Sequence, residues 1–361
     1  MIHKILITLC CFPAALLAAE EPRWRLSSAL QLQSTYDETT LQRVSPRDNQ
    51  PTIISSLTPS LRLSCDELTV DYSLRMKQYN DIPSRNSLNH LGRFSYQTDI
   101  FNWKMHLSDS ISHMEDSGGE ADESISQPQS YLYNRALFRL SGPLKEKAIK
   151  LQIGVDHRDY EHRRKRDWMA IKPSWEVGMA HGVGQFTLRH DYSYNEVDTR
   201  EAVESHLLLA GYDRKINGSV TMDVRGGALL FSDFGVADPA WRVTVTHKTG
   251  ALSTSVHWSR SAAMSSSTSQ LVRRDLFRLQ PIYTFENGLR LAGSASMIYS
   301  ESLDNDRTDT LTARTGVDLS KTLWKGVTGT LTYSYVDQDA RGSRGYDLHG
   351  SIVSMRLSVK Y

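Results

Sequence analysis

Hydrophobic and polar residues alternate one by one along nearly the whole chain, from Arg23 to Tyr361. Successive side chains of a β-strand point to opposite faces, so each such segment predicts one apolar and one polar surface. No helical period of 3.6 residues competes over a comparable length. In the first segment the apolar face carries Trp24, Leu26, Leu30, Leu32 and Tyr36, and the polar face carries Arg25, Ser27, Gln31 and Gln33.

The alternating segments predict about eighteen strands, with sixteen as the alternative. They begin near residues 24, 52, 68, 91, 103, 131, 148, 168, 185, 202, 219, 240, 251, 275, 289, 309, 326 and 348. Short turns, such as Asn287-Gly288, alternate along the chain with longer polar loops. These loops lie at 37–51, 80–90, 112–130, 159–167, 195–201, 231–239, 260–270, 301–308 and 337–347. Turns and loops in alternation are typical of bacterial outer-membrane barrels. The sequence therefore predicts an all-β, transmembrane antiparallel β-barrel, with both termini in the periplasm.

The first nineteen residues have the layout of a secretory signal peptide. Lys4 precedes an apolar stretch from Ile5 to Leu17, and the small residues Ala18 and Ala19 follow. That order of positive, apolar and small residues marks a cleaved signal, and the apolar run is too short to span a bilayer comfortably. We expect cleavage after Ala19, which leaves residues 20–361 as one outer-membrane barrel domain.

Composition narrows the class of protein further. Removal of Lys4 with the signal would leave equal numbers of basic and acidic residues, so no net charge draws the chain to nucleic acid. No later apolar run of about 18 residues occurs, which excludes a helical membrane protein. Cys65 would be the only cysteine of the mature chain, so neither a disulfide framework nor a cysteine metal site is predicted.

The last segment alternates up to a terminal aromatic residue. Ser351, Val353, Met355, Leu357, Val359 and Tyr361 share one face. This ending resembles the C-terminal signal by which the barrel assembly machinery recognises outer-membrane clients. Outer-membrane lipid and lipopolysaccharide are the other partners expected of such a barrel.

If the apolar face meets lipid, the polar face lines the lumen and is strongly basic. By this register it carries seventeen cations and seven acids. The acids are Asp71, Asp156, Glu176, Asp191, Glu204, Asp223 and Asp318, and five of the cations are Arg25, Arg62, Arg93, Lys104 and Lys172. The other twelve are predicted to form a basic pore lining: Arg75, Lys77, Arg139, Lys150, Arg158, Arg189, Arg225, Arg242, Arg278, Arg290, Arg314 and Arg356.

Two interpretations of these arginines stay open. A ring of arginines concentrates anions in a pore and disfavours cations, which indicates a conduit for an anion or an acidic polymer. Alternatively, the arginines pair with neighbouring carboxylates and stiffen the wall. No enzyme site, cofactor or metal site is predicted: His190 looks like a headgroup-level residue, and His157, Asp159, Glu161 and His162 adjoin a mixed-charge loop.

The N-terminal third also resembles a known family. Tyr36-Asp37-Glu38, Thr58-Pro59-Ser60-Leu61, and Tyr79 followed by Asn80 to His90 match a pattern found in outer-membrane β-barrel porins encoded beside exopolysaccharide and exosortase gene clusters. The match covers roughly residues 26–100, and Thr39 stands where that family often has asparagine. The resemblance implies a barrel of about eighteen strands that serves exopolysaccharide secretion with periplasmic polysaccharide-export proteins.

The sequence thus favours a passive channel for export of an anionic exopolysaccharide. The alternatives are a general or anion-selective diffusion porin and a non-conducting structural barrel. A diffusion porin would fold a long loop into its lumen, and the acidic stretch 112–130 is the candidate for that loop.

Overall fold

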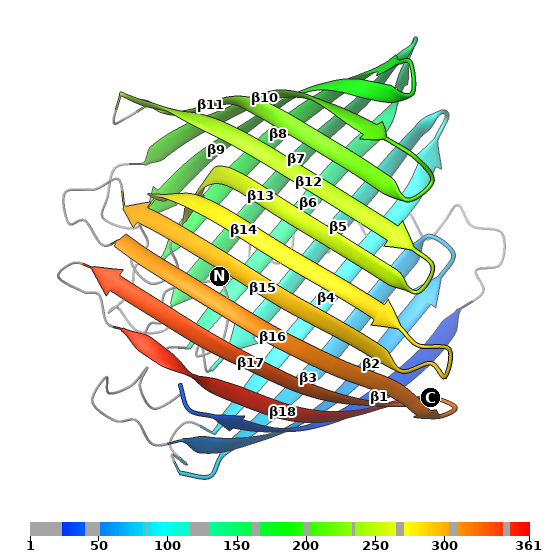
Figure 1. The fold of residues 1–361 in the computed structure, drawn as a ribbon, viewed down its shortest axis with the longest axis vertical. Coiled ribbons are helices and arrows are strands. Elements are labelled where there is room, and N and C mark those ends of the chain that lie inside the picture. Colours follow the sequence, from blue (N-terminus) through cyan, green and yellow to red (C-terminus); the bar gives the residue numbers. More distant parts are fainter. Residues whose placement is uncertain are drawn as a thin grey trace.

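A computed structural model describes residues 24–39, 51–81, 83, 86–115, 130–160, 167–197, 202–232, 235–264, 271–302, 309–341 and 347–361. These ranges form one sheet of eighteen antiparallel strands, drawn from the side in Figure 1. The strands are β1 (Arg25–Asp37), β2 (Thr52–Cys65), β3 (Leu68–Tyr79), β4 (Ser87–Ile100), β5 (Trp103–Met114), β6 (Tyr131–Leu144), β7 (Lys147–Tyr160), β8 (Trp168–His181), β9 (Gly184–Val197), β10 (Val203–Lys215), β11 (Val220–Phe231), β12 (Val236–Thr249), β13 (Leu252–Met264), β14 (Leu271–Thr284), β15 (Arg290–Ser302), β16 (Asp309–Trp324), β17 (Val327–Arg341) and β18 (Leu348–Lys360).

The sheet closes on itself into a barrel. Each strand pairs with its neighbours in sequence, and β1 also pairs with β18 from Ala29↔Lys360 to Asp37↔Ile352. At the seam of the two chain ends, the backbone N–H of Tyr361 donates to the carbonyl of Ser28 at 2.9 Å. Closure leaves no strand without two neighbours, which is what a spanning sheet requires. The predicted eighteen-strand antiparallel barrel is confirmed.

The strand boundaries differ from the sequence expectations mainly at the loop ends. β4, β12 and β14 each begin four residues before their predicted starts, at Ser87, Val236 and Leu271. β17 likewise continues to Arg341, inside the expected loop 337–347. Strands of 12–16 residues exceed the roughly 9–11 that a tilted strand needs to cross a bilayer. The additional pairs extend the barrel on the loop side, where polar sequence hid the alternation.

The two faces of the sheet differ sharply in chemistry. Large apolar side chains are exposed on the outer face: Leu32, Leu61, Tyr72 and Met355, for example, are 45–67% exposed. The cross-strand partners keep this face: Leu61 lies opposite Tyr72, and Leu32 lies opposite both Leu57 and Leu357. Such a band is the surface expected to face lipid. Within the described ranges, no helix is long and apolar enough to cross a membrane.

The predicted turn at Asn287-Gly288 joins β14 to β15. Gly288 has φ of 76°, a conformation that glycine adopts without steric cost, and Asn287 Oδ1 accepts the backbone N–H of Leu289 at 3.0 Å. This turn lies with the other short turns at one end of the barrel, on the right of Figure 1. Both ends of the strand sequence, β1 at Arg25 and β18 at Lys360, lie at that same end.

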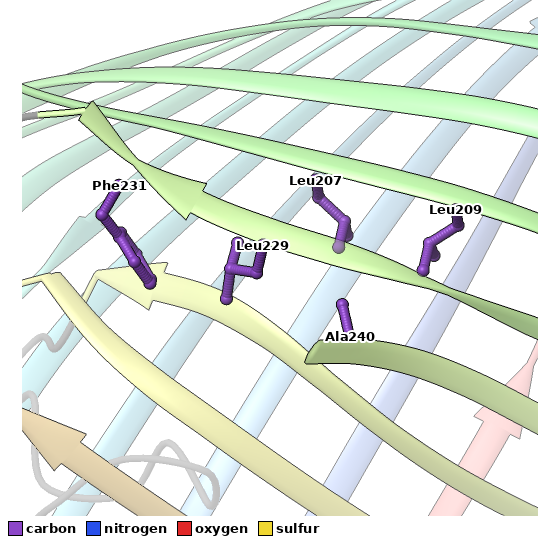
Figure 2. Close-up of a cluster of buried hydrophobic side chains, with 5 residues drawn as sticks. All are labelled: Leu207, Leu209, Leu229, Phe231 and Ala240. Carbon is purple, nitrogen blue, oxygen red and sulfur yellow. The ribbon is translucent and has the colours of Figure 1, made fainter. Parts of the chain in front are cut away.

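The barrel wall bends tightly at β10, β11 and β12. A Cβ added at Gly227 would lie 1.8 Å from the carbonyl oxygen of Leu208, so the neighbouring backbone occupies the space that a side chain would need. Inside this bend, five apolar side chains are at most 8% exposed, and Figure 2 shows them gathered together: Leu207, Leu209, Leu229, Phe231 and Ala240. We call these five residues the corner cluster. They are apolar residues on the polar face, which the sequence reasoning did not anticipate.

Substitution of Gly227 tests the bend. Gly227→Ala should destabilise the barrel by about 1–3 kcal/mol or block its assembly, because overpacking forces the backbone apart. The adjacent Gly226 is a matched control, since a Cβ there would meet nothing within 4 Å. Refolding yield in detergent, read from the heat-dependent shift on SDS gels, compares the two variants. Equal yields for both would contradict the tight bend.

Candidate pore lining

The strand registers put all twelve predicted pore-lining residues on the face opposite the exposed apolar band. Arg225 lies opposite Arg242, Arg189 opposite Glu176, and Arg139 opposite Gln152. On the remaining strands, Arg278 pairs with Ser296, which pairs with Arg314, while Arg356 pairs with Thr330. The same ladders place Arg75 and Lys77 with Asn89 and Ser87, Lys150 with Glu176, Arg158 with Trp168, and Arg290 with Ser320. In each strand these residues alternate with the apolar residues of the outer face, so their side chains point to the luminal side.

One acid was assigned to the wrong face. Glu204 was expected in the lumen, but it lies opposite Tyr194, which shares the outer face with Phe186 and Leu188. β10 begins Val-Glu-Ser-His-Leu-Leu-Leu at residues 203–209. Its three consecutive leucines break the alternation of apolar and polar residues, so the sequence does not show which face Glu204 occupies. Conversely, Arg135 and Arg274 lie on the luminal face and were overlooked. Arg135 has the same parity as Arg139 on its strand, and that signal could have found it.

Many of the luminal arginines lie at a similar distance along their strands. Eight lie four to seven residues from the turn-side end: Arg75, Arg93, Arg139, Arg189, Arg225, Arg242, Arg278 and Arg356. Because the short turns lie together at one end of the barrel, on the right of Figure 1, these residues occupy the turn-side part of the lumen. We call them the arginine band.

On β6 to β8 one luminal acid pairs with two cations. Asp156 Oδ1 accepts Nε of Arg135 at 2.6 Å, and its Oδ2 accepts Nζ of Lys172 at 2.7 Å. Tyr133 donates its hydroxyl to the same carboxylate at 3.2 Å. The Asp156 side chain is only 4% exposed, whereas Arg135 and Lys172 are 59% and 40% exposed. One buried acid therefore holds two cations whose side chains remain partly exposed on the luminal side.

A second network crosses four strands, from β8 to β11. Arg225 donates to Glu176 Oε2 at 2.6 Å and to Asp223 Oδ1 at 2.9 Å. Arg189 contacts the same Glu176 oxygen at 3.7 Å and donates to Asp191 at 2.8 Å. Charge-assisted bonds of this length are the stronger hydrogen bonds of proteins. The network fixes two arginines of the band against the wall.

Near the loop end of β6 to β8, Arg158 lies among aromatic rings. Its guanidinium carbon is 4.6 Å from the ring centre of Tyr131, 5.1 Å from that of Tyr133 and 5.6 Å from that of Trp168. Arg158 is 6% exposed, and Tyr131 is 2% exposed. Cation–π contact strengthens when the cation is shielded from water. Arg158 thus braces the wall, and we class it as structural although its strand position had suggested a pore-lining residue.

The opposite part of the lumen has a different charge pattern. Among the described residues, no carboxylate lies within ion-pair distance of Arg75, Arg93, Arg290 or Arg356. These four arginines lie on β3, β4, β15 and β18, and we call them the open arginines. Ion pairs are therefore most numerous on β7 to β11, although Arg139 and Arg242 also lack a carboxylate within ion-pair distance among the described residues, and Asp71, the partner of Arg62, lies opposite Arg93 in the ladder.

Within the part of the chain that the structure describes, the other candidate residues form no catalytic arrangement. His190 stacks on His206 on the outer face, with ring centres 5.4 Å apart. His157 and Asp159 also lie on that face, opposite Asn134 and Leu132, while Glu161 and His162 lie outside the described residues. Within the described ranges, no group of three or more His, Cys, Asp or Glu side chains could hold a metal ion.

The expected constriction loop falls largely outside the structure's description. Residues 116–129 of the acidic stretch 112–130 are not described, and the predicted signal peptide likewise lies outside the described residues. The beginning of the stretch is anchored to β4: Glu115 Oε2 accepts the N–H of Leu88 at 2.6 Å, and Asn89 Oδ1 accepts the N–H of Glu115 at 2.8 Å.

Comparison with known proteins identifies the fold and nothing finer. No family model matches the chain, and no curated protein matches it significantly. The solved structures that resemble it include the outer membrane protein OpdK of Pseudomonas aeruginosa, with 9% identity, a TM-score of 0.50, and coverage of 93% of this chain and 98% of that chain. The siderophore receptor PirA of the same organism has 9% identity and a TM-score of 0.50, with coverage of 95% of this chain and 81% of that chain. A mutant of its ferric enterobactin receptor PfeA has 7% identity and a TM-score of 0.51, with coverage of 93% and 80%. The chain therefore has the fold of outer-membrane β-barrel proteins.

The Asp156 network yields a stability prediction. Asp156→Asn should lower the free energy of unfolding by about 1–3 kcal/mol, because it leaves a charge-assisted hydrogen-bond network without its acceptor. Asp71→Asn is the matched control: its partner Arg62 is 59% exposed, and such pairs contribute about 0–1 kcal/mol. Urea unfolding in detergent, followed by tryptophan fluorescence, measures both. A larger loss at Asp71 would overturn this ranking of the two pairs.

Proposed function

We propose that the protein is a passive outer-membrane channel that prefers anions and exports an acidic exopolysaccharide. The observation that carries this proposal is the set of open arginines, which face the lumen without carboxylate partners among the described residues. Uncompensated cations in a low-dielectric wall raise the local concentration of anions. A barrel of eighteen strands encloses a lumen wide enough for an aqueous channel.

Several luminal arginines that each bind an anion weakly suit passage of a polymer better than one tight binding site would. Transport requires binding that is favourable enough for entry and weak enough for release. The arginine band offers several cations at similar depth, so successive carboxylates of a polyanion can exchange between them. The ion pairs on β6 to β11 hold several cations of that part of the wall in place. No cofactor takes part, because diffusion down a gradient involves no covalent chemistry.

The cellular setting belongs to the same proposal. We place the short turns and both termini in the periplasm, after export by the signal peptide and insertion by the barrel assembly machinery through the strand that ends at Tyr361. Lipopolysaccharide would surround the loop side, and periplasmic polysaccharide-export proteins would deliver the polymer. The resemblance of residues 26–100 to barrels of exopolysaccharide gene clusters supports this assignment.

The rival function is a diffusion porin for small anions, which the fold likeness to OpdK keeps in view. The two differ in how they treat long polymers. A uronic-acid polysaccharide added on the turn side of a planar bilayer should interrupt the current in a length-dependent way, whereas a neutral dextran of equal length should not. Equal interruption by both polymers, or by neither, would refute export of an acidic polymer and leave the porin.

The open arginines give a direct prediction for selectivity. The double variant Arg75→Gln with Arg356→Gln should lower the anion-to-cation permeability ratio several-fold, because it removes two uncompensated charges from the lumen. Lys321→Gln is the control, since Lys321 lies on the outer face next to the turn. Reversal potentials in a KCl gradient measure the ratio. An unchanged ratio in the double variant would show that these arginines do not face the ion path.

A further inference from the structure

Two ionisable side chains lie on the outer face of the barrel, within the depth that lipid surrounds. Asp109 is the sixth residue after Trp103 at the turn-side end of β5, and His190 is the sixth after Gly184 at the turn-side end of β9. Asp109 lies opposite Phe94, so it belongs to the apolar face. Because the additional strand length lies on the loop side, a crossing of roughly 9–11 residues from the turn side includes both positions.

The same depth on the other strands carries no acid, base or histidine. Between four and seven residues from the turn-side ends, the outer faces of the other sixteen strands carry apolar or aromatic side chains or glycine, as far as the structure describes them. Ionisable side chains at membrane depth are costly in lipid and are usually in contact with protein. The two exceptions therefore indicate that protein, rather than lipid, covers this part of the wall.

Each of the two groups is held by one neighbouring strand. Asp109 is 9% exposed, and its Oδ1 accepts Nδ2 of Asn134 on β6 at 2.9 Å. Nε2 of His190 lies 3.2 Å from Nδ1 of His206 on β10, and the two rings stack. Within the described ranges, Nδ1 of His190 has no hydrogen-bond partner. This nitrogen can pair with a group outside the chain.

The wall between the two groups is apolar and broad. β5 to β9 are consecutive in the sheet, and Figure 1 shows them within the wall behind β12 to β18. On this outer face Phe138, Leu151 and Ile153 are 37–49% exposed. Five strands at a spacing of about 4.8 Å, with an apolar band about 25 Å tall, cover about 600 Å². Two such walls together would bury about 1,200 Å², the lower limit for a specific and stable interface.

Asp109 and His190 are placed symmetrically about β7. Each lies two strands from β7, at six residues from the turn-side end of its own strand. A twofold axis through β7 along the membrane normal would set β5 of one copy opposite β9 of the other, at the same depth. Every contact in a twofold dimer occurs twice, so Asp109 would face the partner subunit's His190 on both sides of the axis.

We propose that the outer face of β5 to β9 is a dimer interface, in which a second copy of this chain packs its β7 against β7. A carboxyl group and an imidazole complement each other in charge and hydrogen bonding, and each gives the other a partner where water is absent. Within one copy β6, β7 and β8 separate the two side chains, so this pairing forms only between copies. The interface does not depend on what passes through the lumen.

Cysteine cross-linking in phospholipid vesicles tests the axis. In a Cys65→Ser background, Ile153→Cys on β7 should form a dimer with a short bis-methanethiosulfonate linker, even when the protein is diluted in lipid. Val317→Cys is the matched control: Val317 lies on the outer face of β16, half the barrel away, and is 47% exposed against 49% for Ile153. It should remain monomeric on the gel. Equal cross-linking at the two positions would refute the interface.

An exchange of the two groups tests the pairing itself. Asp109→His and His190→Asp each set two like groups opposite one another and should lower the dimer fraction several-fold, whereas the double variant with both exchanges should restore it. The Ile153→Cys cross-link measures the dimer fraction, and the heat-dependent gel shift checks that each variant is folded. The proposal is overturned if the single variants dimerise like the parent, or if the double variant restores nothing.

Discussion

The structure depends on one constraint: every backbone N–H and C=O group within the membrane must find a partner in the protein. The antiparallel ladder from β1 to β18, closed by the pairs between those two strands, meets this constraint. Closure then fixes the alternation, since each residue must face either lipid or lumen. The basic lumen follows from this, because the polar parity of the strands carries the arginines.

Ion pairs are distributed unevenly around the lumen, and this unevenness bears on both interpretations of the arginines. Asp156 and Glu176 bind the cations of β6 to β11, so the stiffening role holds there. Arg75 and Arg356 have no carboxylate within ion-pair distance among the described residues, and the proposed conduit rests on such arginines. A barrel that is rigid on one side and cationic on the other can hold its shape while a polyanion slides past.

Most of the fold and much of the lining follow from the sequence because alternation is a local property. Arg225 and Arg242 lie on the face of their strands that their own segments indicate, without knowledge of their neighbours. Prediction failed where a strand breaks the alternation: the leucines of β10 concealed the face of Glu204, and the apolar luminal residues Leu207 and Leu229 belong to a bend that only Gly227 and the packing of three strands explain. The aromatic surroundings of Arg158 and the contact of Arg273 with Asp238 join residues distant in sequence, so no local pattern contains them.

The central claim is that the lumen conducts ions and that its uncompensated arginines set the selectivity. The most direct measurement is the reversal potential of a single purified barrel in a planar bilayer under a tenfold KCl gradient. The account predicts stepwise conductance with a reversal potential of the sign for chloride preference, shrinking towards zero in molar salt as the arginines are screened. A barrel that inserts but carries no current, or one that prefers potassium, would contradict it.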